Sequence, residues 1–254
     1  MLLAIDAGNT HTVVGLFDGQ QLADHWRIAT NSDRTSDELA LMIQQFLGFH
    51  GFSFGDAITG VAVSSGVPMV TAALREMTDR YFGFSALVLE PGVRTGMPIL
   101  YDNPKEVGAD RIANAVGAFE LIGDAVIVVD FGTATTVEAI SKKGEYLGGA
   151  IVPGIEISLD ALFGRAAGLR RVELIEPHSV IGKSTVESIQ SGVIYGFSGQ
   201  VDALVDRFRA EIGDAAVIGT GGLAELIGPH TRNLRRYEPW LTLLGLRLIF
   251  ERNQ

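Results

Sequence analysis

The sequence predicts an α/β protein made of two similar domains. Apolar strands alternate with amphipathic helices along the chain, a pattern typical of α/β folds. The 254 residues suffice for two domains of ordinary size. Two segments also share one pattern, in which an apolar strand leads to an aspartate, a glycine two residues later and then a threonine: Asp6-Ala7-Gly8-Asn9-Thr10 and Asp130-Phe131-Gly132-Thr133. We therefore expect a duplicated domain.

The first half should open with three strands and then alternate helices with strands. The strands are expected at residues 2–6, 12–17 and 21–28, with an Asp18-Gly19 turn before the third. A helix should begin near Thr35, because Thr35 and Glu38 have the spacing of a capping box. The remaining elements are a strand at residues 57–63, a helix at 68–81 and a strand at 86–89.

The second half repeats this order. Its strands are expected at residues 125–130, 135–140 and 146–151. They are followed by a helix at 184–208, a strand at 215–218, a glycine-rich turn at 219–222 and a C-terminal helix at 240–250. The repeat places a boundary near residue 117, with a helix at 111–121 as the connector, so the predicted domains are residues 1–117 and 118–254.

Composition excludes several classes of function. Thirty acidic residues against twenty basic ones give a net charge of −10, which disfavours nucleic acid as the main partner. The chain has no cysteine, so disulfides and thiolate metal sites are excluded. No apolar run approaches the roughly 20 residues that cross a bilayer. We expect a cytoplasmic protein without a membrane partner.

The two Asp-Gly turns would form a phosphate clamp if they faced each other. Glycine lets backbone N–H groups approach phosphate oxygens, and each aspartate can orient a cation. A later segment, Gly219-Thr220-Gly221-Gly222, follows a strand and offers open backbone on which an adenosine could lie. Taken alone, each of these turns could equally be a structural turn, so the evidence lies in the order of the three.

This order resembles the phosphate-1, phosphate-2 and adenosine motifs of the actin, hexokinase and heat-shock ATPase superfamily. The resemblance implies two ribonuclease-H-like domains around a nucleotide cleft, with phosphate-1 in the first domain and the other two motifs in the second. Four segments resemble type III pantothenate kinases in detail: Asp6 to Thr10, Asn103 to Arg111, Asp130 to Thr136 and Gly148 to Gly154.

The resemblance implies a reaction, its cofactors and an assembly. The reaction is transfer of the γ-phosphoryl group of ATP to pantothenate, giving 4′-phosphopantothenate in the first step towards coenzyme A. It implies ATP with Mg²⁺, a monovalent cation (K⁺ or NH₄⁺) and a homodimer. Two alternatives stay open: a kinase of the same fold for another small hydroxylated or carboxylate acceptor, and a catalytically silent regulatory paralogue.

Asp110 is the candidate catalytic residue. It lies in the first turn of an expected helix, where the helix dipole favours a carboxylate. An ionised aspartate can accept the proton of a substrate hydroxyl as that oxygen attacks phosphorus. Locally, Asp110 could equally be a capping residue. The resemblance favours the catalytic role, because the matching aspartate in the family is the proton acceptor.

Other site residues are carried over by the resemblance. Arg111 suits a carboxylate, although a surface ion pair is the alternative. Tyr101 could be an ordinary core tyrosine, and Thr185 could simply start a helix behind Ser184. The substrate contacts implied are Tyr101, Gly108, Ala109, Asp110, Arg111 and Thr185. The ATP contacts implied are Asp6, Ala7, Gly8, Asn9, Thr10, His11, Thr12, Val13, Thr133 and Gly221. Asp130 is implied to hold the monovalent cation, and Asp6 is the candidate magnesium contact.

Overall fold

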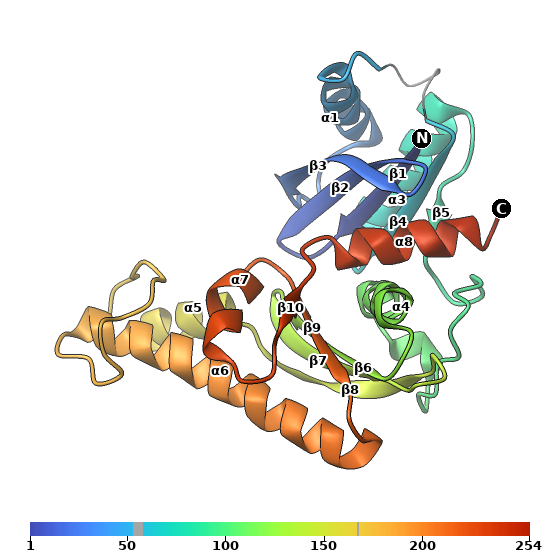
Figure 1. The fold of residues 1–254 in the computed structure, drawn as a ribbon. Helices are drawn as coiled ribbons and strands as arrows, with labels where there is room; N and C mark the ends of the chain where they lie inside the picture. The colour runs from blue at the N-terminus through green and yellow to red at the C-terminus, as the bar shows by residue number, and fades with distance from the viewer. Residues whose placement is uncertain (53–57, 167) are drawn as a thin grey trace. The chain divides into compact units, whose positions relative to one another are not determined.

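The computed structural model describes residues 1–52, 58–166 and 168–254, and contacts between residues divide the chain into two compact units (Figure 1). The first unit comprises Met1–Pro98, Asp102–Gly117 and Leu241–Gln254. The second comprises Ile99–Tyr101 and Ala118–Trp240. The first unit thus includes the C-terminal segment, whereas the division at residue 117 expected from the sequence repeat stays a prediction.

The first unit is built on a five-stranded sheet of order β3-β2-β1-β4-β5. Its strands are β1 (Leu2–Ala7), β2 (His11–Asp18), β3 (Gln21–Ala29), β4 (Gly60–Ser65) and β5 (Leu87–Val88). The first three strands are antiparallel neighbours, and β4 and β5 run parallel to β1. This is the ribonuclease-H-like topology expected from the resemblance.

Helices supply the rest of the first unit. They are α1 (Ser36–Gly48), α3 (Pro68–Met77), the part of α4 (Ala109–Ile122) up to Gly117, and α8 (Leu241–Glu251). Side chains of α1 and α3 join those of the sheet in one buried cluster that includes Leu3, Ile5, Leu39, Ile43 and Leu74.

Helix α8 packs against the sheet and against α4 at glycines. A Cβ at Gly15 of β2 would lie 2.7 Å from the Leu243 side chain, and one at Gly60 of β4 would lie 2.0 Å from the Phe250 ring. A Cβ at Gly245 would lie 1.8 Å from the Ala113 carbonyl oxygen of α4. These glycines are therefore required by close approach, and they fix α4, the helix that carries Asp110, within the first unit.

The second unit repeats the sheet, with order β10-β9-β6-β7-β8. Its strands are β6 (Val126–Phe131), β7 (Ala134–Ile140), β8 (Tyr146–Pro153), β9 (Ala216–Thr220) and β10 (Arg236–Tyr237). Strands β6, β7 and β8 are antiparallel neighbours, whereas β9 pairs parallel with β6 and with β10. The order relative to the first strand is the same as in the first unit, which confirms the predicted duplication.

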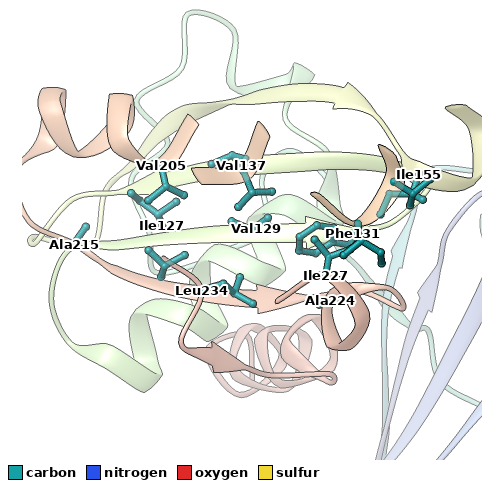
Figure 2. Close-up of a cluster of buried hydrophobic side chains, with 14 of the residues drawn as sticks. Ile127, Val129, Phe131, Val137, Ile155, Val205, Ala215, Ala224, Ile227 and Leu234 are labelled. Atoms are coloured by element: carbon teal, nitrogen blue, oxygen red, sulfur yellow. The ribbon is translucent and has the colours of Figure 1, made fainter. Parts of the chain in front are cut away.

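The core of the second unit lies between its sheet and helices α5 (Ile155–Arg165), α6 (Thr185–Ile212) and α7 (Ala224–Ile227). Figure 2 shows alternate residues of β6, Ile127, Val129 and Phe131, in this cluster with Val205 of α6 and Ile155 of α5. Alternation follows from the two-residue period of a strand, so one face of β6 points to these helices.

Local signals in the sequence agree with the structure. Thr35 caps α1: its Oγ1 accepts the N–H of Glu38 at 3.3 Å, and the Glu38 carboxylate accepts the N–H of Thr35 at 2.8 Å. Ser184 caps α6 by accepting the N–H of Glu187 at 3.2 Å. Gly19 has φ 57°, as the turn between β2 and β3 requires.

Two features of the structure differ from the expectations, and one expectation lies outside the described residues. The helix expected at residues 68–81 ends as an α-helix at Met77 and continues as a π-helical turn over Thr78–Phe82. Helix α5 was not predicted; it starts at Gly154 with no capping side chain, so its sequence carries no start signal. The expected start of a strand at residue 57 lies outside the described residues. No described helix is long and apolar enough to cross a membrane.

Candidate active site

The first Asp-Gly turn joins β1 to β2 in the first unit. Asp6 is half-buried near the end of β1, and Gly8 closes the turn by donating its N–H to the His11 carbonyl oxygen at 3.0 Å. Asn9 and Thr10 are exposed at its tip, as is His11. Thr12 and Val13 belong to β2, and the Thr12 side chain points inward to Thr30, with 2.8 Å between the two hydroxyl oxygens. The exposed part of the expected nucleotide segment is thus its tip.

Asp110 lies in the first turn of α4, as predicted from the sequence, and its side chain is exposed. Its Oδ1 accepts the N–H of Arg111 at 2.8 Å, so the carboxylate folds back over the helix start. A Cβ at Gly108 would lie 2.5 Å from this same oxygen. Glycine at position 108 therefore leaves the space that the carboxylate occupies, which links two of the expected substrate residues physically.

Arg111 is only 8% exposed, and Ala109 is partly buried. The Arg111 side chain is therefore buried and does not lie at the surface. A buried guanidinium brings a fixed positive charge next to Asp110, and such a group can bind a carboxylate with two parallel hydrogen bonds.

The second Asp-Gly turn joins β6 to β7 in the second unit and is closely surrounded by backbone. Gly132 donates its N–H to the Ala134 carbonyl oxygen at 3.1 Å. A Cβ at Gly154, just before α5, would lie 2.2 Å from the Thr133 carbonyl oxygen. This turn therefore packs against the segment that begins α5.

The glycine-rich turn after β9 lies directly beside Asp130. Thr220 is the register partner of Asp130, and a Cβ at Gly221 would lie 2.5 Å from Asp130 Oδ1. Gly221 has φ 88°, a conformation that side chains other than glycine rarely adopt. The structure thus brings together two of the motifs that the sequence assigned to the nucleotide.

Tyr101 and Thr185 lie on other elements of the second unit. Tyr101 is half-buried, with its ring against that of Tyr146 at a centroid distance of 6.3 Å. Thr185 is the first residue of α6 and lines a cavity of about 820 Å³ between α5 and α6. The cavity combines apolar side chains such as Leu159 and Ile189 with hydroxyl groups. Of the described residues that line it, none belongs to the Asp130 turn or the Gly221 turn.

Residues beside both turns were not predicted from the sequence. Ser64 of β4 is the register partner of Asp6 and is buried, and Ser65 accepts the N–H of Val67 at 3.1 Å before α3 begins. A strand followed by Ser-Ser-Gly and a proline at a helix start was the signal available for this turn. Gly154 was quoted as part of a motif, but its contact with Thr133 has no signal in the sequence.

The carboxylates near the two turns suit a hard cation whose other ligands come from phosphate and water. Within the described residues there is no group of three or more His, Asp or Glu side chains that could hold a metal. Magnesium that accompanies a nucleotide usually takes one or two carboxylates, with phosphate oxygens and water completing its shell. Asp6, near the end of β1 and partly accessible, could supply such a carboxylate, and Asp130 has the matching place near the end of β6.

Comparisons with known proteins agree with these features. A family model for type III pantothenate kinase matches residues 2–207. A type III pantothenate kinase from Streptomyces griseus subsp. griseus is 57% identical over 261 residues, covering 100% of this chain and 98% of that protein.

Two solved structures show the fold. One, a Baf family transcriptional activator from Campylobacter jejuni, has a TM-score of 0.62 at 21% identity, covering 99% of this chain and 98% of that chain. The other, a ROK hexokinase from Thermus thermophilus, has a TM-score of 0.52 at 14% identity, covering 99% of each chain. The actin-like ATPase fold predicted from the sequence is thereby confirmed. The family match and the full-length identity together show that the chain belongs to the type III pantothenate kinase family.

Proposed function

We propose that this protein transfers the γ-phosphoryl group of ATP to the primary hydroxyl of pantothenate, giving 4′-phosphopantothenate and ADP. The observation that carries the proposal is the 57% identity along the whole chain to a type III pantothenate kinase. The placement of Asp110 supports the proposal physically. Its side chain is exposed in the first turn of α4, and its carboxylate occupies the space that the absent side chain of Gly108 leaves.

Asp110 is the proposed general base. As the pantothenate oxygen forms its bond to the γ-phosphorus, the hydroxyl proton moves to the Asp110 carboxylate and the bond between the γ-phosphorus and the β,γ-bridging oxygen breaks. ADP leaves with that electron pair. Little covalent chemistry is left to the protein, so its main contribution is to position the reactants and neutralise charge.

The first turn and the glycine-rich turn are the proposed nucleotide contacts. The exposed backbone of residues 9–11 can donate to phosphate oxygens, and Thr133 can add a hydroxyl. The glycine backbone at Gly221, beside Asp130, can support the adenosine. A divalent metal, when bound with ATP, neutralises phosphate charge, and Asp6 is its proposed protein contact. We also propose that Asp130 holds a monovalent cation, K⁺ or NH₄⁺.

Three side chains are proposed to recognise pantothenate. The buried guanidinium of Arg111 can pair with the pantothenate carboxylate. Tyr101 can cover the molecule with its ring. The Thr185 hydroxyl lines the cavity between α5 and α6, where it can donate to an amide or hydroxyl of the substrate.

A coupled assay of ADP release tests the proposal. Wild type is measured with ATP and Mg²⁺, with and without pantothenate and with and without K⁺. We expect pantothenate-dependent turnover that K⁺ stimulates, and we expect Asp110→Asn to lower kcat by about 10² or more, because the general base is lost. Asp33→Asn is the matched control, since it removes an exposed carboxylate from the same unit without touching the proposed site.

The alternatives predict other results. Turnover with another hydroxylated acceptor but not with pantothenate would support a kinase of the same fold with a different substrate. ATP binding without turnover on any acceptor would support a silent paralogue. The homodimer and the cytoplasmic location stay predictions from the sequence, and the homodimer can be checked by light scattering.

A further inference from the structure

A fully buried carboxylate lies in the sheet of the second unit, outside the motifs used above. Glu138 of β7 is 0% exposed, and so is Tyr146, the first residue of β8. The Tyr146 hydroxyl donates a short hydrogen bond to the Glu138 Oε2 atom. Burying a carboxylate is expensive unless it is hydrogen-bonded, so this bond fixes the Tyr146 hydroxyl in one place.

Tyr146 in turn supports Tyr101. The rings of the two tyrosines lie 6.3 Å apart at an interplanar angle of 56°, a tilted packing that aromatic pairs favour. The backbone is fixed as well, because Ile99 forms a bridge with Tyr146 and Leu100 donates its N–H to the Tyr146 carbonyl oxygen at 2.8 Å. All these residues belong to the second unit.

Two consecutive glycines of β8 leave room for this arrangement. A Cβ at Gly149 would lie 2.2 Å from Glu138 Oε2, so only glycine leaves room for the carboxylate there. Gly148 has φ 130° and lies under the Tyr101 ring, since its Cβ would be 3.6 Å from that ring. Packing alone would be satisfied by an apolar pair at 138 and 146. The hydrogen bond between the buried carboxylate and the Tyr146 hydroxyl also fixes the orientation of the Tyr146 ring, which packing alone does not do.

We propose that Glu138 and Tyr146 are positioning residues that hold the Tyr101 ring in the orientation that binds pantothenate. The inference rests on the proposed function, in which Tyr101 contacts that substrate. Neither residue needs to touch the substrate, because their effect passes through the Tyr101 ring. Loss of the pair should therefore weaken pantothenate binding and leave ATP binding almost unchanged.

The test replaces the pair by apolar side chains of similar size, Glu138→Leu with Tyr146→Phe, because removing one partner alone would strand the other in the interior. We expect KM for pantothenate to rise about tenfold, because a misplaced Tyr101 ring binds this substrate less well. KM for ATP should change less than about twofold, because Tyr101 does not contact ATP in the proposed site. Thermal unfolding of the variant reports whether the fold is intact.

A second comparison separates positioning from general structure. In a Tyr101→Ala background the same double replacement should change KM for pantothenate by less than about twofold, because residues that act through one shared partner are not additive. If the effect in that background equals the effect in wild type, the proposal is overturned. If the double variant does not fold, Glu138→Gln with Tyr146→Phe, which breaks the bond without leaving a buried charge, makes the same comparison with and without Tyr101→Ala.

Two controls complete the design. Tyr81→Phe removes a similar bond from the first unit, where the Tyr81 hydroxyl donates to Asp37 Oδ1 at 2.6 Å, and should leave both KM values unchanged. Glu138→Gln keeps an acceptor for the Tyr146 hydroxyl, so its KM for pantothenate should be closer to that of wild type than to that of the double variant. Active wild type with an unchanged pantothenate KM in the double variant overturns this inference alone. Wild type without pantothenate-dependent turnover overturns the proposed function and the inference with it.

Discussion

The turns that follow β1 and β6 occupy the same place in two sheets of the same strand order, yet they differ in their surroundings. The tip of the first turn is exposed, and a Cβ at its Gly8 would lie 3.2 Å from the nearest atom, the His11 carbonyl oxygen. The second turn is enclosed by glycines, since a Cβ at Gly154 or Gly221 would lie within 2.5 Å of the turn or its aspartate. The two units therefore share one topology, while neighbouring segments leave one turn exposed and pack closely around the other.

The largest difference between the two units is expected when alanine replaces the glycine that follows the strand parallel to β6 or β1, which is Gly221 after β9 or Gly66 after β4. Gly221→Ala combines a left-handed backbone with a 2.5 Å approach to Asp130 Oδ1, so the free energy of unfolding should fall by about 3 kcal/mol. The ratio kcat/KM for ATP should fall at least about 100-fold, because Asp130 is displaced. Gly66→Ala, after β4 in the first unit, has no atom within 4 Å of the new Cβ and is the control. Equal effects of the two changes would contradict the comparison.

The next difference concerns the turns themselves. Gly154→Ala places a Cβ 2.2 Å from the Thr133 carbonyl oxygen, whereas Gly8→Ala places one 3.2 Å from the His11 carbonyl oxygen. We expect Gly154→Ala to lower the free energy of unfolding by about 2 kcal/mol, because backbone must move. Gly8→Ala should lower it by less than about 1 kcal/mol. Urea unfolding without nucleotide measures both, and a larger loss from Gly8→Ala would show that the first turn is the crowded one.

In a third comparison, the same kind of replacement, threonine by valine, should change the free energy of unfolding in opposite directions in the two units. Thr12 follows the first turn and Thr135 the second, and they pair with Ala7 and Phe131 respectively. The Thr12 hydroxyl bonds to Thr30, so Thr12→Val should lower the free energy of unfolding by about 1 kcal/mol.

At Thr135 in the second unit we expect a gain of stability. Its hydroxyl is buried and has no hydrogen-bond partner among the residues that the structure describes, so Thr135→Val should raise stability by up to about 1 kcal/mol. Thermal unfolding of the two variants side by side measures both signs. A loss of stability in Thr135→Val would mean that this hydroxyl has a partner in solution.

What could be predicted from the sequence depended on the distance between the interacting residues. The Thr35 and Glu38 capping box and the Asp18-Gly19 turn were predicted because their atoms are neighbours in the chain. The same strand pattern around Asp6 and Asp130 predicted the duplicated sheets. These signals are local, and propensity determines them.

Contacts between distant segments carried no such signal. Gly221 beside Asp130 and Gly154 beside Thr133 are close approaches of backbone that only the folded chain reveals. Helix α8 joins the first unit because Gly15 and Gly60 leave space for its side chains, and no pattern around those glycines predicts it. The buried partner of Tyr101 could not be predicted either, because Tyr146 is far from it in sequence.

The smallest expected difference concerns one hydrogen-bonded carboxylate in each unit, the partly exposed Asp24 in the first and the buried Asp202 in the second. In the first unit, Asp24 Oδ2 lies 2.6 Å from His50 Nε2, and this hydrogen bond is the main reason that the pKa of Asp24 is lowered below 3.8. In the second unit, the buried Asp202 accepts a hydrogen bond from Arg232 Nε at 3.3 Å, and this side-chain bond is the main reason that the pKa of Arg232 is raised. Folding thus lowers the pKa of the carboxylate in the first contact, whereas in the second contact it raises the pKa of the arginine.

Because folding lowers the pKa of Asp24, its contribution to stability is present above 3.8 and is lost as the pH falls through the lower folded value. Asp24→Asn should reduce the free energy of unfolding by at most about 0.5 kcal/mol at pH 7, since the pair is partly exposed and screened by solvent. Urea unfolding of wild type and Asp24→Asn from pH 7 down to pH values below 3.8 measures the difference, which should shrink towards zero at the acid end. A difference that persisted there would mean that Asp24 acts through its packing with His50 and not through its charge.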